Sequence, residues 1–302
     1  MAVSSRPVLV LGGLGLIGSH VVNKLLKGGY SVEVWDDLRT GMEGRLEPHD
    51  RLTVKNVDAS LPESWSVDLK FAACVNCTGM TLLDDKASDI VRVDTAVTTA
   101  MIQHLPASSL IMLSEASITG RSHSHDPHNE QSPAEAEDWE SRSKLMCEVL
   151  LAQSGCVWAS IRLPKVVYGK GQRIDTRGSI VEQVIHSAQE KTPLDVDNQG
   201  QDRFDMIGAE DVADLVASVV HRMPKSLPYP VLHACKGKHY SPGDLVELAR
   251  IMGHATTINR RSDGVPKEWC YPASRPATIV YKWRPVAELE EYMGSRLEPK
   301  GA

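Results

Sequence analysis

Short hydrophobic runs alternate with amphipathic stretches over the first half of the chain. Val8 to Leu11 is an apolar run stopped by glycines, which is typical of a buried parallel strand. Ser19 to Lys27 has apolar residues at helical spacing and ends at Gly28-Gly29, a helix C-terminal signal. Ser31 to Trp35 resembles the first run, so the chain begins with a strand, a turn, a helix and a second strand.

The same alternation continues to about residue 162. We expect strands near 52–57, 71–77, 109–114 and 156–162, and helices near 87–104 and 138–153. Such an order predicts an α/β fold with a doubly wound parallel sheet. From about Pro164, glycine and proline interrupt the pattern, and only Glu210 to Met223 returns to helical spacing. We therefore expect a sheet domain over 1–165 and a smaller C-terminal lobe over 166–302, some segments of which return to the sheet.

A glycine-rich turn joins the first strand to the first helix. Gly13-Leu14-Gly15-Leu16-Ile17-Gly18 has the pattern G-x-G-x-x-G, and Gly12 precedes it. The first glycines permit a sharp turn and let a pyrophosphate approach the backbone, and Gly18 lets the helix pack on the strand. Because this turn follows a strand, opens a helix and is followed about 20 residues later by an acid, it predicts a Rossmann-type dinucleotide site.

The acid is Asp36, at the end of the second predicted strand, with Asp37 beside it. A carboxylate at this position binds the hydroxyl groups of the adenosine ribose and repels a 2′-phosphate. We therefore expect NAD rather than NADP, although the nearby Arg39 leaves NADP open. The alternative is that the two aspartates only begin a polar loop.

Composition excludes several classes of function. The chain has 302 residues, and a net charge of −6 without a basic stripe argues against a nucleic-acid partner. No apolar stretch approaches the ~20 residues that span a bilayer.

Six cysteines in a chain of this length do not form a disulfide framework, so we expect a cytoplasmic protein. The loop with His123, His125 and His128 lacks a rigid frame, and we expect no metal site.

Nearly the whole chain resembles the extended short-chain dehydrogenase/reductase family of NAD-dependent epimerases and dehydratases. The matching segments are Gly12 to His20, Val34 to Gly41, Val75 to Thr81, Ser143 to Glu148, Ile161 to Gly169 and Phe204 to Asp211. The resemblance implies that Asp58 contacts adenine, that Thr78 and Gly79 lie near the nicotinamide, and that Lys144 binds its ribose. It also implies a homodimer formed through the helices near 87–104 and 138–153.

The chain departs from this family at both proton-handling positions. The family uses Tyr-x-x-x-Lys, but Glu140 lies four residues before Lys144. When the strand end Leu113 to Gly120 is aligned on Gly120, the family's catalytic hydroxyl falls on Glu115, and Ser114 and Ser117 lie beside it. A glutamate cannot act as a phenol, so the usual proton donor is missing.

Three hypotheses follow from this departure. In the first, Glu115 and Glu140 form an acid/base pair, because two close carboxylates shift each other's pKa apart. In the second, the protein is catalytically inactive and keeps NAD for a regulatory or structural role. In the third, Ser114, Ser117 or a residue of the C-terminal lobe performs the chemistry.

Basic residues suggest the substrate. Arg203 and Arg275 lie near positions where the family binds a nucleotide-sugar diphosphate, and a guanidinium fork suits phosphate oxygens. Lys165 follows the strand after the active-site helix and can enter the substrate pocket. The alternative is that all three are surface cations. We expect an epimerase- or dehydratase-type enzyme whose net reaction is redox-neutral, acting on the hydroxyl or keto group of a nucleotide-linked sugar or another polar metabolite.

Overall fold

A computed structural model describes residues 5–66, 69–79, 86–172, 179–222, 230–261 and 264–298. Met80, Thr81 and Met223, which belong to segments singled out above, lie outside the described residues.

The centre of the fold is a seven-stranded parallel sheet in the order β10-β6-β5-β4-β1-β2-β3. Its strands are β1 (Val8–Leu11), β2 (Val32–Asp36), β3 (Leu52–Asn56), β4 (Ala73–Asn76), β5 (Ser109–Glu115), β6 (Trp158–Leu163) and β10 (Val231–His233). β1 to β6 follow the predicted order, and the doubly wound α/β sheet is confirmed. β10 comes from beyond residue 165 and pairs with β6, with Val231 opposite Ser160.

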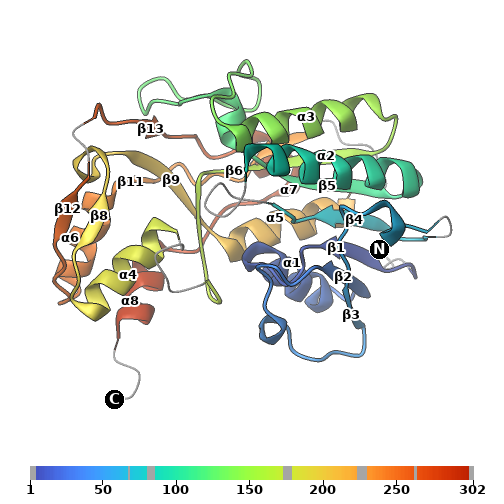
Figure 1. The fold of residues 1–302 in the computed structure, drawn as a ribbon, viewed down its shortest axis with the longest axis horizontal. Helices are drawn as coiled ribbons and strands as arrows, with labels where there is room; N and C mark the ends of the chain where they lie inside the picture. The colour runs from blue at the N-terminus through green and yellow to red at the C-terminus, as the bar shows by residue number, and fades with distance from the viewer. Residues whose placement is uncertain are drawn as a thin grey trace.

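Two helical layers cover the sheet (Figure 1). On one face, α2 (Ala87–His104) and α3 (Trp139–Gln153) enclose a core that includes Leu9, Met101 and Leu151. On the other face lie α1 (Leu16–Lys27), α5 (Ala209–Arg222) and α7 (Arg275–Tyr281), around a second core. Both faces of the central strands are therefore buried, which explains why β1, β4 and β5 are largely continuous apolar runs, whereas the edge strand β3 is mostly exposed.

The smaller lobe has its own core beside the sheet (Figure 1). Its helices are α4 (Ile180–Glu190), α6 (Pro242–Ile251) and α8 (Leu289–Leu297). Its strands are β7 (Val166–Tyr168), β8 (Leu194–Val196), β9 (Arg203–Gly208), β11 (His239–Tyr240), β12 (Ile258–Arg260) and β13 (Glu268–Trp269). β9 is the central strand and pairs with β7, β11 and β13.

Short 3₁₀ turns complete the connections. They are η1 (Glu43–Arg45), η2 (Pro62–Ser64), η3 (Ala116–Thr119) and η4 (Asn198–Gly200). Within the described ranges, no helix combines the length and the apolar character that crossing a bilayer requires.

Candidate functional site

The turn between β1 and α1 requires glycine at specific points. Gly12 has a φ of +70°, a conformation that favours glycine. A Cβ atom at Gly18 would overlap the carbonyl oxygen of Gly12, and one at Gly13 would lie 2.7 Å from Val34. Gly15 is the N-cap of α1, and none of the described side chains caps this helix end. The turn thus brings backbone N–H groups close to any bound anion.

Asp36 ties the end of β2 to this turn. Its carboxylate accepts hydrogen bonds from Leu14 N at 2.8 Å and from Leu38 N at 3.0 Å, and only 6% of the residue is exposed. Leu38 has a φ of 61°, so the chain turns sharply directly after β2. These two backbone contacts fix the Asp36 carboxylate at the point where the resemblance expects a ribose.

A cleft along the carboxyl ends of the strands brings together most of the predicted cofactor residues. Asp58 Oδ1 accepts a hydrogen bond from the Ser60 hydroxyl at 2.7 Å. Thr78 donates two hydrogen bonds to Asn76 Oδ1, one from its backbone N–H and one from its hydroxyl. The walls are formed by Gly12, Gly15, Trp35, Asp36, Asp37, Arg39, Thr40, Val57, Asp58, Ala59, Ser60, Cys77, Thr78, Gly79, Val93 and Val97. Gly13, Leu16, Ile17 and Gly18 instead build the turn and the first turn of α1.

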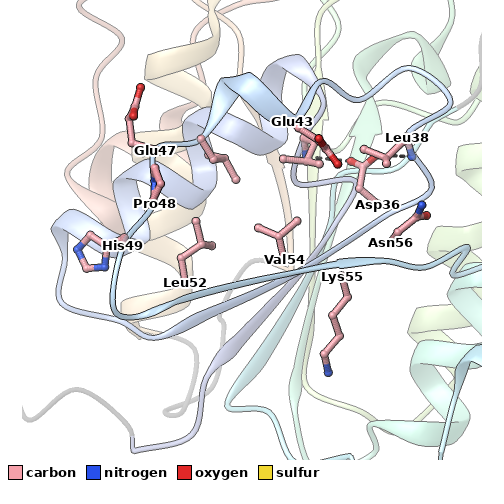
Figure 2. A pocket seen from close by; sticks show the side chains of 12 residues that line it. Asp36, Leu38, Glu43, Glu47, Pro48, His49, Leu52, Val54, Lys55 and Asn56 are labelled. Carbon is pink, nitrogen blue, oxygen red and sulfur yellow. Dashed lines mark hydrogen bonds between the residues drawn. The ribbon is translucent and has the colours of Figure 1, made fainter.

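A second hollow, of about 930 Å³ and open to solvent, lies on another side of Asp36. Figure 2 shows Leu52 and Val54 pointing from β3 toward the loop that contains Glu43 and Glu47. Its walls are mostly apolar and lack the glycines of the cofactor turn. The cleft described above therefore remains the better candidate for a dinucleotide.

Lys144 lies on α3 and points toward the neighbouring helix α2. Its ammonium contacts Asp94 Oδ1 at 2.9 Å and the Thr78 carbonyl oxygen at 3.4 Å. Burial lowers the pKa of Lys144, but the charge of Asp94 and their hydrogen bond outweigh this effect and raise it. Ser143 also donates to Asp94, at 2.9 Å. Lys144 is therefore a buried, charged group next to Thr78, which lines the cleft.

A buried ion pair sets the position of α3. Glu148 accepts hydrogen bonds from Arg162 Nε at 3.0 Å and Arg162 Nη2 at 2.7 Å. The hydroxyls of Ser114 on β5 and Ser160 on β6 donate to the same carboxylate at 2.9 and 2.6 Å. Glu148 thereby connects α3 to two strands. The Ser114 hydroxyl proton is used in this structural contact.

Glu115 ends β5 in a cluster of charged groups. Its Oε2 accepts a hydrogen bond from the Ser117 hydroxyl at 2.9 Å. Burial raises the Glu115 pKa, and the charge of Lys165 and the Ser117 bond reduce that rise. Lys165 in turn contacts Asp138 Oδ2 at 2.7 Å. Asp138 was not among the predicted site residues, although its place directly before α3 is an N-cap signal that points to it.

Glu140 lies in the first turn of α3, two residues after Asp138, and is half-buried. Asp138 is the carboxylate whose charge acts to raise the Glu115 pKa. An acid/base pair between Glu115 and Glu140 stays a prediction.

The two arginines lie on different elements of the fold. Arg203 is on β9, where its guanidinium contacts the carbonyl oxygen of His239 at 2.9 Å and Asp244 at 3.4 Å. Arg275 is the first residue of α7 and is exposed. Their assignment to a diphosphate also stays a prediction.

The histidine loop makes protein contacts. His128 Nδ1 lies 2.6 Å from the Thr119 carbonyl oxygen, and His123 lies 3.5 Å from Glu268. In the part of the chain that the structure describes, no three His, Cys, Asp or Glu side chains are grouped as a metal site requires.

Comparisons with known proteins show the family and the fold. The model of the NAD dependent epimerase/dehydratase family matches residues 8–230. UDP-glucuronic acid decarboxylase 1 of Xenopus tropicalis is 23% identical over 308 residues, covering 95% of this chain and 70% of the relative. A UDP-glucose 4-epimerase of Thermus thermophilus in complex with NAD has a TM-score of 0.82 at 20% identity, covering 97% of this chain and 98% of that one. A Thermotoga maritima UDP-glucose 4-epimerase with UDP-glucose has a TM-score of 0.83 at 18% identity, covering 97% of both chains.

The buried ion pair between Glu148 and Arg162 predicts that losing one partner lowers the stability of the protein strongly. Glu148→Ala leaves Arg162 charged and buried, so the free energy of unfolding should fall by about 3–5 kcal/mol, measured by urea denaturation. Glu190→Ala, at the exposed end of α4, is the matched control and should change it by less than about 0.5 kcal/mol. Similar losses for the two variants would contradict a structural role for Glu148.

Proposed function

The chain belongs to the NAD-dependent epimerase/dehydratase family, and on this premise we propose that it is an enzyme that binds NAD. The proposed substrate is a nucleotide-linked sugar, or a polar metabolite of similar chemistry. The proposed reaction interconverts a hydroxyl and a keto group without net oxidation. The observation that carries the proposal is the buried Lys144, charged and in contact with Thr78 in the wall of the glycine-lined cleft.

Cofactor binding has the strongest support. The glycine turn leaves room for a pyrophosphate, Asp36 and Asp58 offer carboxylates to the adenosine, and Lys144 offers a cation to the second ribose. NAD, when bound, supplies a hydride acceptor and donor. The carboxylate of Asp36 favours NAD over NADP, because it would repel a 2′-phosphate. The Thermus thermophilus structure, which is similar in fold, is a complex with NAD.

Glutamates take the proton-handling role in this proposal. Glu115 replaces the family's catalytic hydroxyl and accepts a proton from the substrate hydroxyl. Glu140 replaces the tyrosine and acts as its acid/base partner. Burial raises the Glu115 pKa, a shift in the direction that makes a carboxyl a better proton acceptor.

Substrate recognition is proposed from basic groups and from relatives. Lys165 is paired with Asp138 at the start of α3, and Arg203 and Arg275 are the candidates for phosphate oxygens. The Xenopus tropicalis relative is named for UDP-glucuronic acid, and the Thermotoga maritima structure contains UDP-glucose. These names support a nucleotide-linked sugar as the first substrate class to test.

A second candidate is a protein that binds NAD without turnover. It is favoured by one observation, the replacement of the family's tyrosine by Glu140. The two candidates share the cofactor site and differ only in chemistry, so substrate turnover separates them.

A homodimer through α2 and α3 is part of the proposal. The outer face of α3 carries exposed apolar side chains at helical spacing, including Trp139, Met146 and Val149, with Leu150 beside them. Val149 is 54% exposed. Apolar side chains gathered on one helix face are typical of a surface that packs on a partner.

The cofactor proposal predicts selective binding. By titration calorimetry, NAD should bind at least about tenfold more tightly than NADP, and Asp36→Asn should reduce that preference because the full negative charge is lost. Asp50→Asn, in an exposed loop, is the control and should leave both affinities unchanged. Tighter binding of NADP by the natural protein would refute the assignment of Asp36.

The catalytic proposal predicts turnover that depends on glutamate. UDP-glucose and UDP-glucuronic acid are incubated with the NAD-loaded protein, and products are resolved by chromatography. Glu140→Gln should reduce turnover by about 100-fold or more while leaving NAD affinity intact. Glu137→Gln, on the exposed segment before α3, should retain activity. Full activity of Glu140→Gln would exclude the glutamate pair, and NAD binding without turnover of either sugar would favour the second candidate.

The dimer proposal predicts a change of mass. In sedimentation velocity, the natural protein should behave as a dimer at micromolar concentration, and Met146→Lys with Val149→Lys should convert it to a monomer by burying charge at the contact. Ile251→Lys, at a residue of α6 that is 70% exposed, is the matched control. A monomeric natural protein would contradict the proposed interface.

A further inference from the structure

A third hollow, here called the basic hollow, lies between the end of α1 and the helix α5. It encloses about 1080 Å³ and is open to solvent. Its walls include four basic side chains and two tyrosines, namely Lys24, Lys27, His221, Arg222, Tyr30 and Tyr281. The glycine turn of the cofactor cleft is at the opposite, N-terminal end of α1, so the basic hollow is a separate place on the molecule.

The basic hollow carries a net positive charge. Among the described residues that line it, Asp214 is the one carboxylate, and it forms an ion pair with Lys24. Lys27 and Arg222 have no counter-ion within the described parts of the chain. Arg222 donates to the carbonyl oxygen of Val280 at 2.6 Å, and its guanidinium lies 6.0 Å from the ring centre of Tyr281, so this cation is held in the wall. Two unbalanced positive charges suit a ligand that carries two negative charges.

The Tyr281 hydroxyl is a second, independent observation. Only 4% of Tyr281 is exposed, and its buried hydroxyl has no hydrogen-bond partner among the residues that the structure describes. The other tyrosine of the wall differs, because the Tyr30 hydroxyl lies 3.1 Å from His221 Nδ1. Buried polar groups in proteins are normally hydrogen-bonded. An unpartnered hydroxyl in the wall of a charged hollow is therefore a donor that a ligand can use.

Cations at helix ends also have a simpler structural role. Lys24 and Lys27 lie in the last turn of α1, and His221 and Arg222 lie in the last turn of α5. Positive charge there complements the carbonyl end of each helix. That role does not require the two helix ends to line one hollow. It also leaves the Tyr281 hydroxyl unexplained, because Tyr281 is the last residue of α7 and belongs to neither helix.

We propose that the basic hollow is a second binding site, which takes the phosphate group of a small molecule, either free phosphate or a phosphomonoester. Arg222 uses one nitrogen for Val280 and keeps further N–H donors for phosphate oxygens, and Lys27 supplies a point charge. Tyr281 supplies a hydroxyl donor. A phosphate dianion balances the two unpaired cations, whereas a single carboxylate would balance only one. The inference is independent of the proposed function, because it uses neither the cofactor cleft nor the glutamates.

The experiment is an NMR titration of the ¹⁵N-labelled full chain with sodium phosphate and, separately, with glycerol 1-phosphate, against sodium chloride of equal ionic strength. The amides of Gly28 and Ser218 report the basic hollow, and those of Gly13 and Gly15 report the glycine turn. Both probes should give saturable shifts at Gly28 and Ser218, and the probe that binds more tightly identifies the source of the phosphate. Lys27→Gln should weaken this binding by about tenfold or more, because a charge-assisted contact is lost. Lys70→Gln, which removes an exposed lysine outside the hollow, is the matched control.

Tyr281→Phe separates binding from folding. It should weaken phosphate binding without lowering the melting temperature, because the hydroxyl has no partner in the described protein to lose. Three results would each overturn the proposal: shifts confined to the glycine turn or absent altogether, equal phosphate affinity in Lys27→Gln and Lys70→Gln, and a Tyr281→Phe variant that loses stability but keeps its phosphate affinity. The titration needs neither NAD nor a sugar substrate, so its outcome is distinguishable from a failure of the proposed function.

Discussion

The buried pair between Glu148 and Arg162 is the interaction on which the site geometry depends. Through Ser114 and Ser160, the same carboxylate joins α3 to β5 and β6. Glu148 follows Lys144 by about one helical turn on α3. The contacts that hold Glu148 therefore also set the direction in which the Lys144 side chain leaves the helix. A buried ion pair adds little net stability compared with an apolar core, but breaking it is costly, and here it specifies how the helix lies on the sheet.

Two lysines near these elements form separate ion pairs. Lys144 is paired with Asp94, and Lys165 is paired with Asp138. Each buried or half-buried cation of this group therefore has its counter-charge within the protein. Glu115 differs, because burial raises its pKa and the cations near it are shared with other carboxylates. In our proposal, this carboxyl takes the place of the hydroxyl that the family uses.

The elements of the sheet and the glycine turn followed from local patterns, because each depends on residues close in sequence. The strand bounds differ from expectation by one or two residues; β4, for example, is confined to Ala73–Asn76, and β5 continues to Glu115. α1 begins at Leu16, since Gly15 is its cap. The pair of Asp138 and Lys165 was not predictable, because it depends on how α3 lies against the end of β6. Apart from β9, the strands of the lobe have two or three residues and are too short to show periodicity, and Leu194 pairs with the distant Ile258.

The most direct test of the proposed site is a crystal structure with NAD bound. We predict the pyrophosphate at the glycine turn, Lys144 on the nicotinamide ribose, and the Glu115 carboxyl within about 4 Å of an open pocket beside the nicotinamide ring. A pyrophosphate elsewhere would contradict the cofactor site. A Glu115 side chain turned away from the nicotinamide would contradict the proposed chemistry and favour a protein that binds NAD without turnover.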